Sequence, residues 1–176
     1  MTQSHAYWQG SATADTTWVA SAAGRLELEE GRPVVGQTGD NIDLALPTLN
    51  RLWPEAFPFF SRWDYYITNA SNEVHFQSCT GRTEARNKDI LNPTNLERLQ
   101  AAVGNRRYVV LLGKKALVTA KAAKLGGVWF YGCHPSLSAV NRKYKLGPDA
   151  VTLSSSERNA LRLSKWAADI QQIPRS

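Results

Sequence analysis

Two residues of this chain have side chains suited to hydrogen-bond recognition, and each follows an apolar run. His134 lies in His134-Pro135-Ser136 after the run at residues 128–131, and Asn69 ends Tyr66-Ile67-Thr68-Asn69. An imidazole can donate a hydrogen bond, and an amide side chain both donates and accepts. The structural alternatives are a histidine satisfied by neighbouring backbone and an asparagine that stabilises the turn after a strand.

The cysteine content argues against a metal centre or a disulfide framework. Cys79 and Cys133 are the only cysteines, and no C-x-x-C pair is present. Two isolated thiols do not make a four-thiolate cluster or a zinc site. We therefore expect no metal, no cofactor and a reducing compartment.

Positive charge is concentrated in one part of the chain. The 21 lysines and arginines exceed the 15 acidic residues, for a net charge of +6. Residues 81–145 contain 13 basic and three acidic residues, whereas the rest of the chain contains eight basic and 12 acidic residues. Such a segment is typical of proteins that bind the nucleic-acid backbone, and a solvated basic surface is the alternative.

The length and composition indicate one domain over residues 1–176. The chain is 43% hydrophobic and 20% charged, close to the average for globular proteins. The first 20 residues have no apolar stretch of signal-peptide length, and no 18-residue uncharged apolar run occurs. We expect a soluble, cytoplasmic monomer that makes no membrane contact.

Apolar runs that alternate with helical patterns indicate an α/β fold. Strand-like runs cover residues 16–22, 64–70, 108–112 and 128–131, and helical patterns cover 40–53 (kinked or split at Pro47), 93–103, 114–124 and a helix from the capping box Ser154-Ser155-Ser156-Glu157 to near Pro174. Continuous apolar strands are typical of parallel sheets covered on both faces. We predict a three-layer α/β/α sandwich with a central, mainly parallel sheet of about four strands.

The loops after these strands are the expected place for a site, because ligands of such sheets bind beyond the carboxyl ends of the strands. The four loops are residues 21–24, 68–71, 113–115 and 133–138. They contain both of the residues singled out above.

The ordered motifs resemble those of the uracil-DNA glycosylase superfamily over residues 16–145. They are Ala20-Ser21-Ala22-Ala23-Gly24, an acidic stretch, Gly31-Arg32-Pro33-Val34-Val35-Gly36-Gln37-Thr38-Gly39, Tyr66-Ile67-Thr68-Asn69, Val110-Leu111-Leu112-Gly113 and His134-Pro135-Ser136. The layout is similar to the iron–sulfur type, which carries G-E-A-P-G, G-R-P-F-V-G-x-A-G, Y-I-T-N, V-x-L-G and H-P-S. The resemblance implies a DNA glycosylase that flips a non-standard pyrimidine and hydrolyses its N-glycosidic bond, leaving an abasic site.

The resemblance also implies roles at the base. His134 stands where the family has the histidine that hydrogen-bonds the oxygen of the departing pyrimidine. Asn69 matches the asparagine that reads the flipped base, and Gly24 and Gly36 would let the backbone approach the nucleotide.

Contacts with the DNA duplex are expected next to His134. The segment Pro135-Ser136-Leu137-Ser138 resembles the loop that presses on the duplex, with Leu137 as the candidate wedge. Arg142, Lys143 and Lys145 follow and would hold flanking phosphates, although a solvated basic face is the alternative.

The chain departs from the family pattern where the attacking water is positioned. The first loop offers only Ser21 among alanines, where the family commonly has an acid or an amide. Asp40 is the best substitute and Gln37 a weaker one, although an aspartate there is more often a helix N-cap. An enzyme that relies on electrostatic stabilisation of the oxocarbenium is the alternative. Val34 replaces the phenylalanine that stacks on uracil, which would widen the pocket. The cysteines of the iron–sulfur cluster are also absent.

These departures favour a bulkier base than uracil, such as hydroxymethylated or glucosylated cytosine of phage DNA, and hence a role in phage defence. Uracil in mismatches or single strands, and hence DNA repair, remains open. One alternative is a non-catalytic DNA-binding module that has the same fold and has lost the water activator. A third is an unrelated α/β enzyme of small nucleosides, which would leave the basic segment unexplained.

Overall fold

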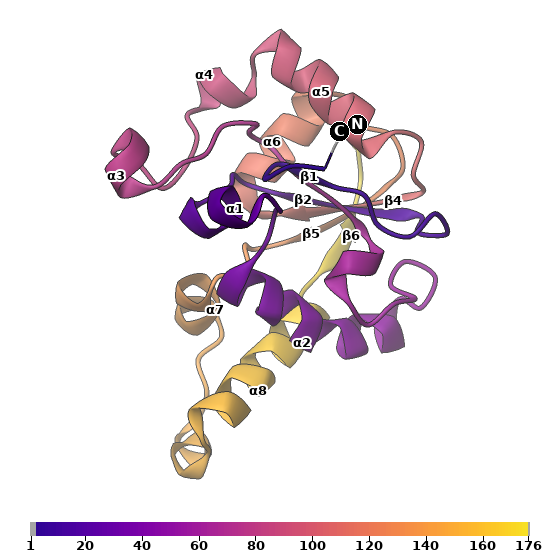
Figure 1. The fold of residues 1–176 in the computed structure, drawn as a ribbon. Coiled ribbons are helices and arrows are strands. Elements are labelled where there is room, and N and C mark those ends of the chain that lie inside the picture. Colours follow the sequence, from indigo (N-terminus) through magenta and orange to yellow (C-terminus); the bar gives the residue numbers. More distant parts are fainter. Residues whose placement is uncertain (1–2, 176) are drawn as a thin grey trace.

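A six-stranded sheet between two layers of helices forms the centre of the computed structural model, which describes residues 3–175 (Figure 1). The strands are β1 (Tyr7–Trp8), β2 (Thr16–Ala20), β3 (Tyr66–Asn69), β4 (Tyr108–Leu112), β5 (Val128–Gly132) and β6 (Gln171–Ile173). The helices are α1 (Arg25–Glu30), α2 (Gly36–Leu52), η1 (Arg62–Asp64), α3 (Gln77–Thr80), α4 (Asn87–Ile90), α5 (Pro93–Val103), α6 (Gly113–Ala122), α7 (Leu137–Lys143), η2 (Pro148–Thr152) and α8 (Ser155–Ala168).

The strand order is β1-β3-β2-β4-β5-β6, in which the inner four strands are parallel. The two edge strands pair antiparallel, β1 with β3 and β6 with β5. The predicted α/β/α class is confirmed, but the predicted number of strands was too low. The missed edge strands are two and three residues long, too short to give a periodic pattern.

Two helix predictions are corrected. The C-terminal helix ends at Ala168 and not near Pro174, because residues 171–173 pair with β5. Helix α2 begins at Gly36 and continues as one helix through Pro47. Pro47 is exposed, so the carbonyl that loses its helical hydrogen bond there can reach water.

Both faces of the sheet are buried, as continuous apolar strands require. Along β2, Trp18 packs into the core under α2 and α8, and Val19 packs into the core under α5 and α6. In β4, Val110 packs into the first of these cores and Val109 into the second. In Figure 1, α2 and α8 lie below the sheet, and α5 and α6 lie above it.

The parallel arrangement brings the carboxyl ends of the inner strands to one edge. Ala20 of β2 is in register with Asn69 of β3, and Leu112 of β4 with Gly132 of β5. The loops that follow these strands therefore begin side by side. No helix within residues 3–175 is long and apolar enough to cross a membrane.

Candidate functional site

A pocket of about 410 Å³ opens at the carboxyl edge of the sheet. It is lined by Ser21, Glu84, Leu112, Gly113, Lys114, Lys115, Tyr131, Cys133, His134, Ser136, Ser138, Ala139 and Arg142. Three of the four loops that were predicted to carry chemistry meet here, because β2, β4 and β5 end at this edge.

His134 lies on the pocket wall, two residues beyond the end of β5 at Gly132. Within residues 3–175 no hydrogen bond reaches its ring, so both nitrogens are available to a ligand. Burial lowers the pKa of His134, and the nearby carboxylate of Glu84 acts in the opposite direction. The imidazole is therefore neutral at pH 7 and can donate one hydrogen bond without carrying charge.

Gly113 lets the chain turn from β4 into α6 close to His134. Its φ of +87° favours glycine, and a Cβ there would lie 3.5 Å from the His134 Cβ. No side chain caps the start of the ten-residue helix α6. The free N–H groups of its first turn therefore add positive potential to this side of the pocket.

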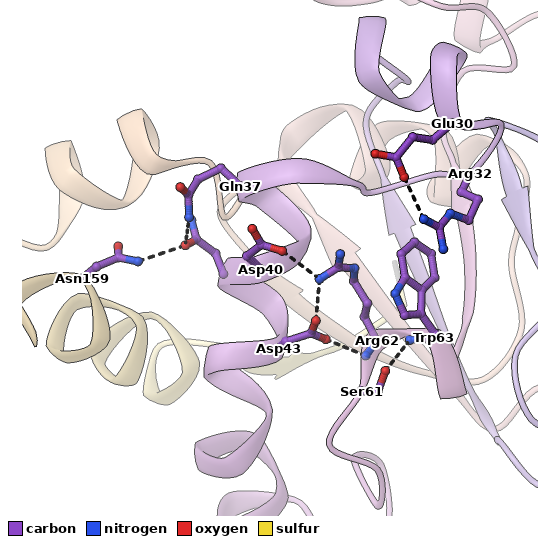
Figure 2. Close-up of polar contacts among 10 residues, drawn as sticks. Glu30, Arg32, Gln37, Asp40, Asp43, Ser61, Arg62, Trp63 and Asn159 are labelled. Atoms are coloured by element: carbon purple, nitrogen blue, oxygen red, sulfur yellow. Dashed lines mark hydrogen bonds and ion pairs between the residues drawn. The ribbon is translucent and has the colours of Figure 1, made fainter. Parts of the chain in front are cut away.

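The backbone next to His134 is held by Asn41 of α2, which sequence reasoning missed. Asn41 has no exposed area, and its amide donates to the Pro135 carbonyl at 2.7 Å. Its own oxygen accepts from Gln37 at 3.0 Å and from Asn159 at 3.1 Å (Figure 2). The available signal was an amide next to Ile42, on the apolar stripe of α2.

Ser21 lies in the same pocket as His134, as predicted for loops at one sheet edge. Its Oγ is buried and has no hydrogen-bond partner among residues 3–175. A buried hydroxyl without a partner is unfavourable, so Ser21 would gain a hydrogen bond by turning its side chain toward a ligand or water in the pocket.

The residues predicted to contact DNA lie in the loop after His134 and along helix α7. Ser136 caps α7 by accepting from the Ala139 N–H at 3.4 Å, and Leu137 at the start of α7 is 42% exposed. Arg142 lines the pocket, one turn or more further along α7.

The two predicted lysines are placed differently from Arg142. Lys143 is bound to Asp169, with 2.7 Å between Nζ and Oδ2, so its charge is largely neutralised. Lys145 is exposed just beyond α7 and is not among the residues that line the pocket. Lys114 and Lys115, which were not predicted, do line it.

Asn69 does not reach this pocket. Its side chain is 1% exposed, and its amide donates to the His5 carbonyl at 3.2 Å. The residues just before β1 cover it, and Arg98 binds its backbone carbonyl at 2.6 Å. Asn69 therefore joins the carboxyl end of β3 to the N-terminal segment in this structure.

Val34, Gly36 and Gly24 also lie away from the pocket lining. Val34 is 3% exposed and packs into the core under α2. Gly36 has a φ of +65° at the start of α2, and Gly24 precedes α1, where its N–H donates to Glu27 at 2.9 Å. The two glycines form turns that place helices α1 and α2.

Asp40 faces Arg62 and is not the N-cap of α2, which is Val35. In Figure 2, Asp40 and Asp43 point at the guanidinium of Arg62, which lies 4.7 Å from the ring centre of Trp63. Asp40 binds it at 3.3 Å but is 60% exposed, whereas burial raises the pKa of Asp43. The cluster fixes η1 against α2, and Asp40 does not line the pocket.

Glu84 is the only carboxylate among the pocket-lining residues that the structure describes. It lies between α3 and α4, about 50 residues before His134 in the sequence. The sequence held one signal for it, since Glu84 is one of three acids in the basic segment 81–145.

A larger cavity of about 500 Å³ lies beside β3 and α5 and is lined by Arg98. Arg98 donates to Thr68, Asn69 and Asn95, all neutral groups, and burial lowers its pKa to about 10. Glu73 also lines this cavity. We favour the smaller pocket as the functional site, because Arg98 is already occupied in joining β3 to α5.

Comparison of the chain with models of known protein families gives no match, and comparison with curated proteins gives none. No group of three or more His, Cys, Asp or Glu within residues 3–175 is placed to hold a metal ion.

Proposed function

We propose that this protein is a DNA glycosylase that flips a non-standard pyrimidine out of DNA and hydrolyses its N-glycosidic bond. The observation that supports this most is His134, a neutral imidazole without a protein partner in a pocket at the carboxyl edge of the sheet. Bond cleavage leaves negative charge on the base and oxocarbenium character on the sugar. A donor such as the His134 N–H, fixed before the reaction, stabilises the departing base.

The cations around the pocket support DNA as the substrate. Lys114, Lys115 and Arg142 line it, and the free N–H groups of α6 face the same side. These groups would neutralise phosphates on either side of a flipped nucleotide. Leu137 is exposed nearby and suited to fill the space that the nucleotide leaves.

For the base itself, we propose a modified pyrimidine such as hydroxymethylated or glucosylated cytosine. A volume of about 410 Å³ falls in the range of pockets for ligands larger than a bare pyrimidine. Val34 lies in the core, so it gives no stacking platform for uracil. In this proposal the protein acts as a cytoplasmic monomer without a metal, in phage defence.

An abasic-site assay on two substrates tests the function. The substrates are uracil-containing oligonucleotides and phage DNA with hydroxymethylated or glucosylated cytosine, and the variants are His134→Ala and His5→Ala as a matched control. His5 lies outside the pocket, where its ring contacts the Asn72 carbonyl. We expect alkali-labile breaks in the modified phage DNA that are lost in His134→Ala and kept in His5→Ala.

The same assay separates the rival function. The loop at residues 20–24 has no carboxylate, which is the feature expected of a non-catalytic DNA-binding module with this fold. Salt-dependent DNA binding without breaks in either substrate would favour that module. Breaks in the uracil substrate alone would indicate repair and refute the modified base.

A further inference from the structure

Hydrolysis is assisted by a group that orients water and accepts its proton, and none of the three residues predicted for this task is sufficient. Gln37 donates to Asn41 and does not line the pocket. Ser21 lies in the pocket, but a hydroxyl is a poor proton acceptor at neutral pH. Asp40 has the right chemistry, but its carboxylate faces Arg62 and does not line the pocket. None of these residues places a carboxylate inside the pocket, so a base there has to come from another part of its lining.

Glu84 places a carboxylate where these residues do not. It lines the pocket together with Ser21 and His134, although the three residues come from separate segments of the chain. Its negative charge acts on the His134 imidazole and raises the pKa of that ring against the effect of burial. Glu84 and His134 therefore line one pocket and are close enough for the charge of the carboxylate to act on the imidazole.

The buried hydroxyl of Ser21 is an independent sign that a small polar molecule binds here. Its Oγ is sequestered and without a partner among residues 3–175. A water molecule bound to this Oγ would satisfy it, and the water would still have a proton to donate to a carboxylate. A water held by Ser21 would therefore lie in the pocket that the carboxylate of Glu84 also lines.

We propose that Glu84 is the general base of this enzyme and that Ser21 positions the water which Glu84 deprotonates. This inference rests on the proposed glycosylase function. The water oxygen forms a bond to C1′ of the sugar as the C1′–N bond breaks. The bonding electron pair leaves with the base, whose oxygen accepts a hydrogen bond from His134.

The proton from water passes to Glu84 and then, through solvent, to the released base. The sum of the reaction is a nucleotide residue plus water giving an abasic sugar and a free base. Before transfer, the negative carboxylate of Glu84 also stabilises the positive charge that develops on the sugar.

Single-turnover cleavage of the substrate that the wild type cuts tests this assignment. The variants are Glu84→Gln and, as a matched control, Glu97→Gln, an exposed carboxylate on α5. We expect the Glu84→Gln rate to fall by about 10²–10⁴-fold, as for loss of a general base, with DNA binding kept. Glu97→Gln should cleave at the wild-type rate.

The pH profile provides a second readout. In the wild type the rate should fall at acid pH, as for a reaction that needs an ionised base, and in Glu84→Gln the residual rate should lose this acid limb. His134, Lys114, Lys115 and Arg142 line the pocket in both proteins, so a limb that only Glu84→Gln loses reports on Glu84. Ser21→Ala should lower the rate less than Glu84→Gln and keep the limb.

A Glu84→Gln rate within a factor of two of wild type would overturn the assignment of Glu84 while leaving the glycosylase function intact. Loss of cleavage in Asp40→Asn with Glu84→Gln still active would do the same and return the role to Asp40. A wild type that makes no abasic product in any substrate would instead refute the proposed function, and the role of Glu84 with it.

Discussion

Asn41 gives the sharpest test of how the fold positions the pocket. Its fully buried side chain donates to the Pro135 carbonyl at 2.7 Å and accepts from Gln37 and Asn159. Through these bonds a single amide joins α2 and α8 to the residue that follows His134. Asn41→Ala removes all three bonds at once.

The loss of stability in Asn41→Ala depends on whether each former partner can hydrogen-bond to water instead. Because Pro135 is buried, leaving its carbonyl without a hydrogen bond costs about 1–3 kcal/mol of stability. Loss of the hydrogen bond from the half-buried Asn159 costs about 1 kcal/mol more. Gln37 is exposed and can turn to water, so its loss is small. We expect Asn41→Ala to lower the free energy of unfolding by about 2–4 kcal/mol. A shift of His134 by about 1 Å would also lower the cleavage rate by about 10²-fold.

Urea denaturation at pH 7 and single-turnover cleavage measure the two effects. Asn50→Ala is the matched control, because Asn50 lies on the same helix and donates to a different carbonyl, that of Phe57, at 2.9 Å. The control should lose about 1–3 kcal/mol, because the Phe57 carbonyl that it leaves unpaired is also buried, and it should keep its cleavage rate. An Asn41→Ala variant as stable as wild type, or one that cleaves as fast as Asn50→Ala, would refute the positioning role.

Two further predictions concern charged groups. Burial lowers the pKa of His134 below its usual 6.5. At a pH between this lowered pKa and 6.5, His134 is protonated in the unfolded chain but not in the folded one, so stability should fall as the pH drops through 6.5. His134→Gln should weaken this loss between pH 7.5 and 5, and equal losses of urea midpoint in both proteins would contradict it. Asp43→Asn should cost about 2–3 kcal/mol, because buried Arg62 loses its nearest carboxylate, whereas Asp40→Asn at an exposed position should cost under about 1 kcal/mol. Thermal unfolding measures this difference, and a larger cost for Asp40→Asn would show the ranking to be wrong.

The sequence by itself determined the α/β class and the inner strands, because these depend on local pattern. Residues 108–112 form a continuous apolar run and are a strand with the same bounds. Ser154 and Glu157 form the expected capping box, since each binds the backbone N–H of the other. The parallel sheet then required the loops with Ser21 and His134 to meet at one edge.

Only the tertiary structure decided which side chains share the pocket. Asn69 ends the parallel strand β3 and His134 follows the parallel strand β5, yet Asn69 is turned to the His5 carbonyl, 64 residues away, while His134 lines the pocket. Glu84 enters the pocket from a loop without a regular pattern, and Asn41 reaches Pro135 across 94 residues. Periodicity reports the face of an element on which a side chain lies. The partner on that face is set by the packing of distant segments, which no local pattern encodes.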